Sequence, residues 1–405
     1  MCIRDSYQDI GDYLSRVEKL KLIQGFGSFK GIKCKKITPN SSNDWINQRD
    51  PTFNRFIPLV GKDGEEQGIF DICSNGILTS RDPWVYNFSR KYLADNLKRM
   101  IDFYNLQAEE YRTSCKGLSK DQRPQIDSVI DNNPQKISWS SSLKILLSRL
   151  LFLKFDNHQI TEGMYRPFSK QWFYFDNRLN HRVSQMPKML PLESASNIVI
   201  CVSGIAASKE FSALVTDIAP NFHMHDTGQC FSLYTYESQD NTGSLFSGKE
   251  GTGSRRQENI PDSVLEEFRK IYRGKAISKE DIFYYVYGIL HSLEYKRRFE
   301  SDLKKMLPRI PFAQDFWAFS KAGRELAQWH LNYETVEPYP LQEHSDKLGF
   351  DSKDHHHVTK MIFGKKDRKE DKTTIIYNSH ITLSGIPLEA YDYVCLLYTS
   401  PSPRD

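Results

Sequence analysis

The chain has 405 residues, of which 39% are hydrophobic and 13% aromatic, so it holds enough apolar side chains for packed cores in roughly two or three domains. Its formal net charge of +4 is mildly basic, which suits a DNA-binding protein without specifying one. No apolar run reaches the ~18 residues of a membrane-spanning helix. The scattered cysteines contain no CxxC pair, so we expect reduced, buried thiols in a cytoplasmic protein.

Both ends of the chain look foreign to the rest. The first six residues, MCIRDS, and the last eleven, CLLYTSPSPRD, can be encoded by DNA strings that overlap as reverse complements, as in a sequencing adapter read at both ends of a fragment. We therefore expect residues 1–6 and 395–405 to derive from an adapter, and we exclude them from the fold prediction. The rest, about Tyr7–Val394, is then an internal piece of a longer gene product.

The first part of the chain predicts one amphipathic helix followed by short or irregular pieces. Five apolar residues at helical spacing favour a helix over Asp12–Ile23. These residues are Leu14, Val17, Leu20, Leu22 and Ile23. Beyond the helix we expect a strand over Gly31–Thr38, an irregular or helical piece over Trp45–Phe56, a charged loop over Gly61–Gly68 and an extended segment over Ile69–Phe88.

Two helices and a series of strands follow. Ser89 can cap a long helix over about Arg90–Arg112, in which apolar residues again recur at helical spacing. A second helix is predicted over Ser140–Leu153. Across Phe155–Tyr236 the pattern indicates mostly strands and turns, including the very apolar segment Ile198–Val202.

A polar segment separates this strand-rich part from a helical one. Ser238–Ile260 is rich in Gly and Ser and poor in apolar residues, which predicts a mobile loop. The helices predicted after it cover Asp262–Tyr272, Lys279–Leu290, Ser292–Met306 and Gln314–Leu331. Ser278 and Asp281 are spaced as a cap for the second of them. The tail, Asn332–Val394, mixes loops with short strands such as Thr373–Tyr377 and His380–Leu383. Strands first and helices later indicate an α+β fold.

Three motifs resemble catalytic or metal sites but do not satisfy their requirements. Gly243–Glu250 nearly fits a phosphate-binding loop, yet Glu250 stands where Ser or Thr would reach magnesium. His355–His357 are adjacent, so they cannot all face one ion, and we expect a surface loop there. His223 and His225 would share one strand face, a weak metal or catalytic signal that more often marks a polar strand face. We predict no catalytic or metal site.

The stretch Gly163–Pro187 is the most informative part of the sequence. It interleaves basic residues with six aromatic residues and contains a single acid, Asp176. Cations hold phosphates and aromatic rings meet bases, so this mixture suits a nucleic-acid surface. A β-hairpin with core aromatic residues and a solvated basic rim is the alternative, and composition alone favours that alternative.

Several segments resemble, in matching order, the C-terminal part of Type ISP restriction-modification enzymes. These are long bacterial proteins with nuclease, helicase-like ATPase, adenine methyltransferase and target-recognition modules. The segments are Tyr7–Leu20, Asp44–Leu59, Ile69–Ser89, Gly163–Arg182, Asp281–Pro311 and Ile375–Val394. The resemblance covers nearly all of Tyr7–Val394, and segments of this length are more specific than a short motif.

The resemblance implies a domain organisation. Residues 7–60 would be the end of the methyltransferase module, with a remnant edge of its α/β domain. Residues 69–237 would be the strand-rich part of the target-recognition domain, 238–260 a flexible loop, and 261–394 its helical and C-terminal part. The methylation motif Asn-Pro-Pro-Tyr/Phe is absent, as are the S-adenosylmethionine, helicase and nuclease motifs. We therefore expect no cofactor in this piece, whereas a parent restriction endonuclease and adenine-N6 methyltransferase would use S-adenosylmethionine, ATP and Mg²⁺.

The implied function is sequence-specific recognition of duplex DNA, which positions an adenine for N6 methylation by the upstream domain. The partners would be double-stranded DNA and the upstream methyltransferase and motor domains of the same chain, with no membrane involved. The implied location is the bacterial cytoplasm, and the nucleoid when the protein is bound to DNA. The alternative is a scaffold that couples the methyltransferase to the helicase-like motor through protein contacts.

Within the basic-aromatic stretch we predict DNA contacts from Arg166, Lys170, Arg178, His181 and Arg182. Arg166 precedes Pro167, which biases its backbone toward an extended form that can project the guanidinium. Arg178 and Arg182 are four residues apart, so they would share a face on either a helix or a strand. They could hold successive phosphates or a guanine edge. Ion pairing with Asp176 or another acid is the alternative.

Three further arginines are candidates for DNA contact. Arg81 could instead pair with Asp82 as part of the structure. Arg255 and Arg256 fall in the predicted mobile loop, which could order on DNA, and a solvated charge run is the alternative for them.

Overall fold

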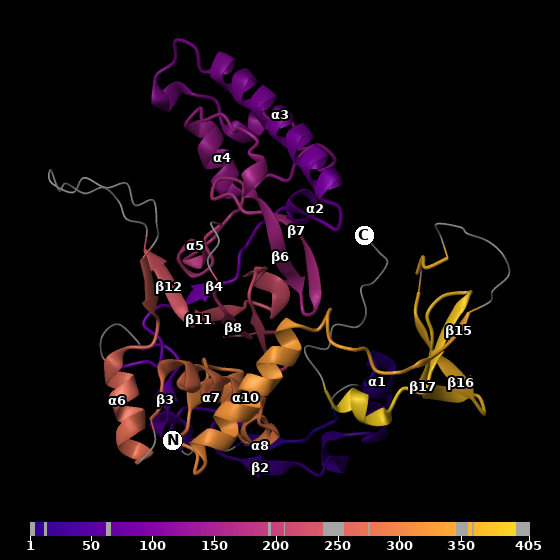
Figure 1. Ribbon diagram of the computed structural model, residues 1–405. Helices are drawn as coiled ribbons and strands as arrows, with labels where there is room; N and C mark the ends of the chain where they lie inside the picture. Colours follow the sequence, from indigo (N-terminus) through magenta and orange to yellow (C-terminus); the bar gives the residue numbers. More distant parts are fainter. Residues whose placement is uncertain are drawn as a thin grey trace.

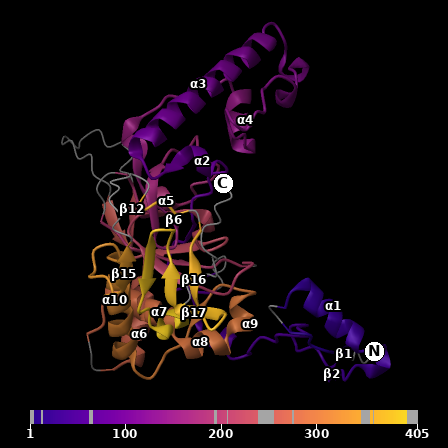
Figure 2. The same ribbon diagram turned by 90° about the vertical axis from the view of Figure 1, so that its right-hand side faces the viewer.

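The computed structural model describes residues 5–11, 14–61, 66–192, 196–205, 207–237, 255–273, 276–345, 355–358 and 360–393. The molecule is elongated, with a helical lobe above a strand-rich middle and a helical base below (Figure 1). An N-terminal arm and a C-terminal sheet stand out from the base (Figures 1 and 2). Mixed helices and strands in separate regions confirm the α+β prediction.

The arm consists of β1 (Asp5–Tyr7), α1 (Arg16–Gly25), the 3₁₀ turn η1 (Phe29–Gly31) and β2 (Lys35–Ile37), and β1 pairs antiparallel with β2. Ser15 and Glu18 form a capping box that fixes the start of α1. The predicted helix is therefore present, although its apolar stripe buries no residue. Val17 is 61% exposed and Leu20 55% exposed, so most of the stripe faces solvent.

The upper lobe is built on the two helices that were predicted there. The long α3 (Arg90–Ser114) begins at Ser89, whose hydroxyl accepts from the Tyr92 amide, and it buries one side along Leu93, Leu97, Met100, Ile101 and Tyr104. The shorter α4 (Ser141–Ser148) begins at Ser140. It ends before the predicted Leu153 because Leu150 takes a left-handed conformation with φ of 55°. The one-turn α2 (Asp82–Val85) interrupts the segment that was predicted to be extended.

The basic-aromatic stretch forms a β-hairpin at the base of this lobe. Its strands, β6 (Ile160–Arg166) and β7 (Ser169–Tyr174), lie in a sheet of order β10-β6-β7-β5, with β5 at Tyr86–Asn87 and β10 at Ala219–Pro220. Phe173 and Tyr174 are fully buried. The two-residue turn has Pro167 first and Phe168 second, with φ of 57° at Phe168, as a type II turn requires. Phe168 packs edge-on against Tyr333, so packing holds it in this left-handed conformation.

A second sheet separates two hydrophobic cores. It has the order β4-β11-β8-β9, with the strands at Ser74–Asn75, Gln229–Ser232, Val199–Val202 and Ala213–Thr216. Every residue of β8 and β9 is buried. Val199 and Cys201 face the upper core, which contains α3, whereas Ile200 and Val202 face the lower core, which contains α7. Because side chains alternate along a strand, one sheet forms a wall of both cores.

The base is helical, with α6 (Asp262–Ile271), α7 (Lys279–His291), α8 (Leu293–Arg298), α9 (Glu300–Leu303) and α10 (Phe316–Leu331). Ser278 and Asp281 form the predicted capping box of α7. The helix predicted over Ser292–Met306 is two helices, because the chain leaves helical geometry at the buried Phe299. Two glycines let α7 and α10 touch: a Cβ at Gly288 would overlap the Phe319 carbonyl oxygen, and one at Gly323 the Tyr284 carbonyl oxygen.

Two-stranded pairs and a separate sheet complete the fold. β3 (Ile57–Pro58) pairs with β14 (Arg309–Ile310), and β12 (Tyr234–Glu237) pairs with β13 (Arg255–Glu258). The C-terminal sheet has the order β15-β18-β17-β16, with the strands at Gln342–Ser345, Ile381–Ser384, Lys369–Ile376 and Ile362–Lys366. It includes both of the strands predicted in the tail. The short α5 (Met186–Met189) and the 3₁₀ turns η2 (Phe53–Arg55), η3 (Lys120–Gln122), η4 (Ile126–Ser128), η5 (Asn157–Gln159), η6 (Phe222–Met224) and η7 (Leu388–Asp392) occupy the connections. Among the described residues, no helix is long and apolar enough to span a bilayer.

Candidate nucleic-acid interface

One short segment, Gly76–Asp82, lies between the loop after β7 and η6 and is hydrogen-bonded to both. We call it the junction segment. Leu78 and Arg182 exchange two backbone hydrogen bonds of 2.9 Å. Ile77 accepts from the amide of Phe222 at 2.9 Å. Arg182 and η6 are therefore held on either side of the junction segment, although they are distant in the sequence.

Arg166 is bound to the same assembly by its side chain. Its guanidinium donates to Asn221 Oδ1 at 3.3 Å and lies 3.8 Å from the carboxylate of Asp82. It also sits over the ring of Tyr165, 3.9 Å from the ring centroid. The side chain is 28% exposed. For Arg166, the structure therefore shows the ion pair that was the alternative to DNA contact, with Asp82 as its acid.

Arg81 is buried, which corrects our prediction that it contacts DNA. It is 1% exposed and donates to the Ser138 carbonyl at 3.2 Å and to Ser140 Oγ at 2.7 Å. Burial lowers the pKa of its guanidinium to about 10. Its partners are polar groups at the start of α4, and Asp82, the partner that we considered, pairs with Arg166 instead. Arg81 therefore fixes the start of α4 beside the junction segment.

Arg178 and Arg182 lie on the surface of the loop after β7, and both are exposed. Asp176 accepts hydrogen bonds from the backbone amides of Arg178 and Leu179, and its carboxylate forms no ion pair with either arginine. Neither guanidinium makes an ion pair with any residue in the described part of the chain. The loop backbone is thus fixed while its two cations face solvent.

His181 lies between these arginines and is half-buried. Its Nδ1 is 3.0 Å from Ser142 Oγ, in the first turn of α4. Partial burial, and then the nearby positive charges of Arg182 and Arg81, lower its pKa and favour the neutral imidazole. His181 therefore connects the loop to α4, and in its neutral form it can donate and accept hydrogen bonds.

The other predicted contacts lie away from this loop. Lys170 is the second residue of β7, at the end of the strand away from this loop. It pairs with Glu334 at 3.2 Å and sits over the ring of Tyr333. Arg255 and Arg256 are exposed on β13, so the mobile-loop prediction is wrong for these residues, because pairing with β12 orders their backbone. Arg256 stacks on Tyr234, 4.3 Å from the ring centroid. Residues 238–254, which include the phosphate-loop-like motif, lie outside the described residues.

Two features that bear on DNA contact were not predicted from the sequence. The arm carries seven Lys and Arg residues between Arg16 and Lys36 against one acid, Glu18, and none of the seven forms an ion pair within the described residues. Counting charge by segment would have found them. The second is the exposed His223 of η6, which only the tertiary fold places beside the junction segment and the buried Asn221 that binds Arg166.

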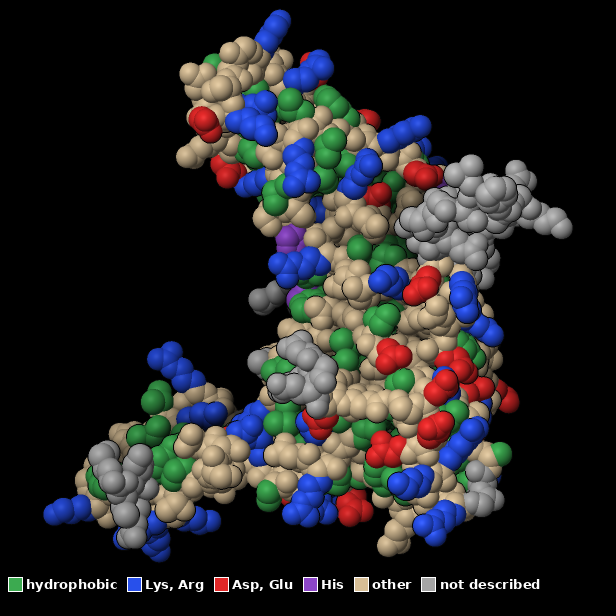
Figure 3. Space-filling model, turned by 90° about the vertical axis from the view of Figure 1, so that its left-hand side faces the viewer, with side chains coloured by type: hydrophobic (Ala, Val, Ile, Leu, Met, Phe, Trp, Pro, Cys, Tyr) green, Lys and Arg blue, Asp and Glu red, His purple; other side chains and the backbone are tan. Residues whose placement is uncertain are grey.

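One face of the molecule is hollowed. Figure 3 shows a concave face between the helical lobe above and the arm below, with Lys and Arg side chains on both projections and histidine along the hollow. Asp and Glu side chains gather on the main body, at the side away from the hollow (Figure 3). An anionic polymer would therefore meet mainly cations at this face.

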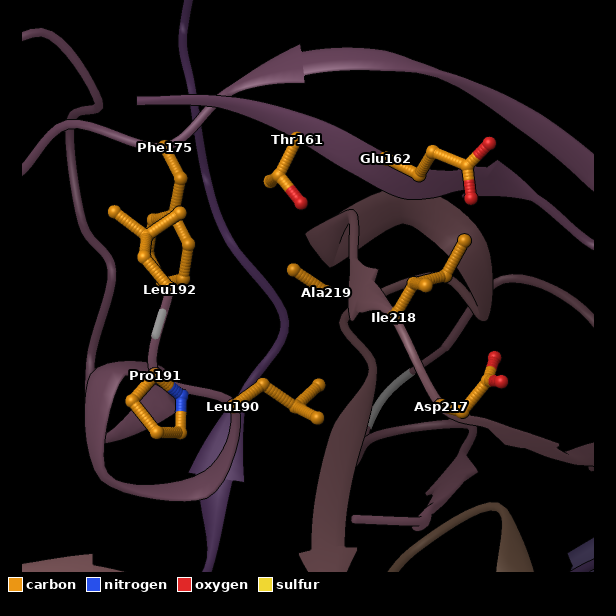
Figure 4. A pocket seen from close by; sticks show the side chains of 9 residues that line it. All are labelled: Thr161, Glu162, Phe175, Leu190, Pro191, Leu192, Asp217, Ile218 and Ala219. Carbon is orange, nitrogen blue, oxygen red and sulfur yellow. The ribbon is translucent and has the colours of Figure 1, made fainter. Parts of the chain in front are cut away.

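The pocket in Figure 4 has a different character. It encloses about 180 Å³ beside β6 and β10, with Phe175, Leu190 and Leu192 on one side and the carboxylates of Glu162 and Asp217 on the other. Its charged side chains are both acidic, so it does not suit a phosphate group. We therefore assign it no part in the candidate nucleic-acid interface.

The histidine motifs form no metal site in the described part of the chain, where no cluster of three His, Cys, Asp or Glu side chains could hold an ion. His223 and His225 do not share a strand face, since they lie in and after η6, with His223 exposed and His225 fully buried. Burial lowers the pKa of His225 to about 3. His355 and His356 pack on one another in a loop, as expected for a surface segment.

Comparison with known proteins places this geometry in a family. Three solved structures match 96% of this chain: a nuclease-deletion mutant of the Type ISP restriction-modification enzyme LlaGI in complex with a DNA substrate mimic (33% identity, TM-score 0.76), the ATP-dependent Type ISP enzyme LlaBIII bound to DNA (32%, 0.76) and a DrdV-DNA complex (28%, 0.78). The match covers 33%, 24% and 37% of those chains, so this chain spans about a quarter to a third of their length. No curated protein matches. Residues 68–395 match the family described as the Type ISP C-terminal specificity domain, and the chain belongs to that family.

Proposed function

We propose that this chain recognises a target sequence in duplex DNA as the specificity region of a Type ISP restriction-modification enzyme. The observation that carries the proposal is the loop after β7, which presents Arg178 and Arg182 to solvent without an acidic partner among the described residues while its backbone is tied to the junction segment. Fixed mounting lets a guanidinium discriminate between base edges, because recognition geometry is then set before binding. The three similar structures are described as DNA complexes or as bound to DNA, which supports the same ligand here.

The candidate residues would act in three ways. Arg178 and Arg182 would reach base edges or phosphates, and His181 would offer its neutral ring beside them. Arg166 would act as a positioning residue, since Asp82 and Asn221 hold its guanidinium beside η6. The cations of the arm would contact phosphates from the other margin of the hollow face.

The finer role is to position an adenine for N6 methylation by a methyltransferase domain outside the present chain. Residues 7–60 would then be the end of that domain, and S-adenosylmethionine, ATP and Mg²⁺ would be used by the longer enzyme. Nothing in this sequence carries the Asn-Pro-Pro-aromatic motif that adenine methylation needs. The proposal thus assigns binding and positioning, and no catalytic step, to the residues described here.

One observation favours a second role for the arm. Val17, Leu20 and Phe29 are 61%, 55% and 75% exposed, and exposed apolar side chains of this size mark protein-contact surfaces when they cluster. The arm would then dock on the methyltransferase or motor domain, as in the scaffold hypothesis, while the loop after β7 contacts DNA.

Selection followed by crosslinking tests the proposal. A pool of random duplexes is enriched on the 405-residue chain, and the preferred duplex, carrying a photoreactive base, is crosslinked to it. The proposal predicts one enriched sequence and crosslinked peptides from Gly163–Pro187. A scaffold would enrich no sequence and would leave this stretch uncrosslinked, which would contradict target recognition.

A further inference from the structure

The hairpin formed by β16 and β17 ends in a concentrated positive charge. Its two-residue turn is Asp367-Arg368, flanked by the directly opposed pair Lys366 and Lys369. These four turn residues hold three cations and one acid, and all four are exposed. No ion pair involves any of them in the portion of the chain that the structure describes. We call residues 366–369 the basic tip.

Two features of the basic tip oppose its own stability. Lys366 and Lys369 face one another across the hairpin, and like charges in directly opposed positions repel. Asp367 and Arg368 have φ of 51° and 65°, the left-handed pair that a type I′ turn requires. Asn-Gly or Asp-Gly normally fills such a turn, and Arg in the second position is strained where Gly is not. Local rules broken without a structural gain point to a function.

Two acids follow the tip on β17: Glu370, which stands directly opposite Lys365, and Asp371, which is occupied by a bulge. The register of the hairpin shifts between Phe363 and Gly364, so that three residues of β17, Lys372–Thr374, bulge out. The carboxylate of Asp371 stabilises this bulge by accepting three hydrogen bonds. The donors are the Thr373 amide at 3.0 Å, Thr373 Oγ1 at 2.6 Å and Thr374 Oγ1 at 3.1 Å. Lys366 contributes only the last and smallest of the effects that lower the pKa of Asp371, after these hydrogen bonds. The carboxylate therefore serves the bulge and leaves the tip cations unpaired.

The base of the hairpin is anchored, so the tip is a fixed projection. Tyr391 of η7 donates to the Lys372 carbonyl at 2.7 Å and packs edge-on against Phe363. Gly364 meets Thr374 at the bulge, where a Cβ would come within 2.9 Å of the threonine Cβ. The tip extends beyond these contacts, on outer pairs for which the described part of the chain shows no third strand.

We propose that the basic tip is a sequence-independent contact for the phosphate backbone of duplex DNA, separate from the hollow face. The C-terminal sheet stands at the side of the base, away from the α3–α4 lobe (Figure 1), so the tip adds a contact that the arginines after β7 do not supply. The inference rests on the proposed function, because it takes DNA as the ligand of the chain. Lys and Arg without acidic partners release counterions when they meet phosphates, and they carry no information about base sequence.

Two substitutions in the same turn separate charge from strain. Arg368→Gly and Asp367→Gly each replace a residue in the left-handed conformation by glycine, which adopts it freely, so both should leave the hairpin folded. Arg368→Gly removes a cation and should lower the magnitude of the slope of log affinity against log salt by about 0.9. Asp367→Gly removes the acid and should raise DNA affinity. Opposite changes from two matched turn variants cannot come from a change in folding.

The triple variant Lys366→Gln, Arg368→Gln, Lys369→Gln gives the largest signal. It should lower the slope by roughly 2–3 when all three phosphate contacts are lost, with equal weakening on the preferred duplex and on a scrambled one. The control is Lys270→Gln, Arg273→Gln, two exposed residues at and just beyond the C-terminal end of α6, which lies across the base from the C-terminal sheet (Figure 1), and it should leave the slope unchanged. Thermal unfolding of each variant verifies the fold.

The outcomes are distinct for the two proposals. Unchanged affinity and slope in the triple variant would overturn the tip contact and leave target recognition standing. Weakening of the preferred duplex alone would also overturn it, because the tip would then read sequence. Loss of binding to anionic lipid vesicles, with DNA binding unchanged, would assign the tip to a membrane surface instead. If the unmodified chain binds no duplex, both proposals fail.

Discussion

The guanidinium of Arg166 lies 3.8 Å from the carboxylate of Asp82, and this pair joins the tip of the β6–β7 hairpin to the end of the junction segment. Asp82 also accepts from Asn221 Nδ2 at 3.4 Å and is hydrogen-bonded to Thr79 Oγ1. One carboxylate thus ties together β6, α2 and η6. The exposed arginines after β7 are mounted on the other side of the same segment, through Leu78.

Arg166→Ala should weaken the contacts that hold β6, α2 and η6 together through Asp82. Loss of the partly buried ion pair and of the Asn221 hydrogen bond should lower the free energy of unfolding by about 1–2 kcal/mol, since Asp82 and Asn221 lose a charged partner. Urea unfolding measures it. Arg182→Ala is the matched control and should change stability by less than ~0.5 kcal/mol, because its side chain is exposed. Equal stability of the two variants would refute the positioning role of Arg166.

At position 168, glycine should give a more stable protein than alanine, although alanine is usually the less destabilising substitution. Both substitutions remove its packing against Tyr333 and His330, at ring-centroid distances of 5.2 and 5.6 Å. Each should cost about 2–3 kcal/mol for that lost packing. Because φ is 57°, Phe168→Gly should be less destabilising than Phe168→Ala by about 1 kcal/mol. The comparison of the two by thermal unfolding fails if alanine is the more stable.

The contact between α7 and α10 should not tolerate a single added methyl group. A Cβ at Gly288 or Gly323 would overlap a backbone carbonyl of the facing helix, which cannot move as a side chain can. Gly288→Ala should lower the free energy of unfolding by about 3 kcal/mol, as expected for overpacking against backbone. Gly25→Ala at the end of α1, where nothing lies within 4 Å, should be neutral or stabilising. Similar effects at the two sites would contradict the close packing.

The buried histidines should make stability fall as pH falls. Burial lowers the pKa of His330 to about 4 and that of His225 to about 3, from an ordinary value of 6.5. Between pH 6.5 and the lowered pKa of each histidine, the unfolded chain binds a proton that the folded chain does not. The free energy of unfolding therefore decreases as pH drops below 6.5. Each histidine can contribute at most about 1.4 kcal/mol per pH unit.

Replacing one histidine tests that slope. His225→Gln should flatten the dependence of unfolding free energy on pH between about 6 and 4. Replacement of the exposed His223 by Gln should leave the slope as it is. A parallel curve for the two variants would show that His225 is not the group that titrates on unfolding.

Helix starts were predictable from the sequence because their signals are local. Ser89 caps α3, and Ser278 with Asp281 caps α7, in each case through atoms within three residues. The hairpin of the basic-aromatic stretch was also predictable as the alternative to a DNA surface, and its buried Phe173 and Tyr174 confirm that alternative for the aromatic residues.

What the sequence could not supply depends on partners far along the chain. Arg81 is buried because Ser138 and Ser140, more than fifty residues later, accept its hydrogen bonds. The polar segment at Arg255 is a strand because β12 pairs with it, an interaction that composition does not encode. The tie between Arg166 and Asn221 likewise appears only once β6 and η6 are adjacent.

In the proposed function, Arg178 and Arg182 select the DNA target. The most direct measurement compares the dissociation constants of the preferred duplex and of a scrambled duplex at one salt concentration. Their ratio is determined for the unmodified chain and for the double variant Arg178→Ala, Arg182→Ala. A base-edge contact is worth about 1–3 kcal/mol of discrimination, so the ratio should fall at least about tenfold. An unchanged ratio would contradict target selection by these two arginines, whatever the salt slope.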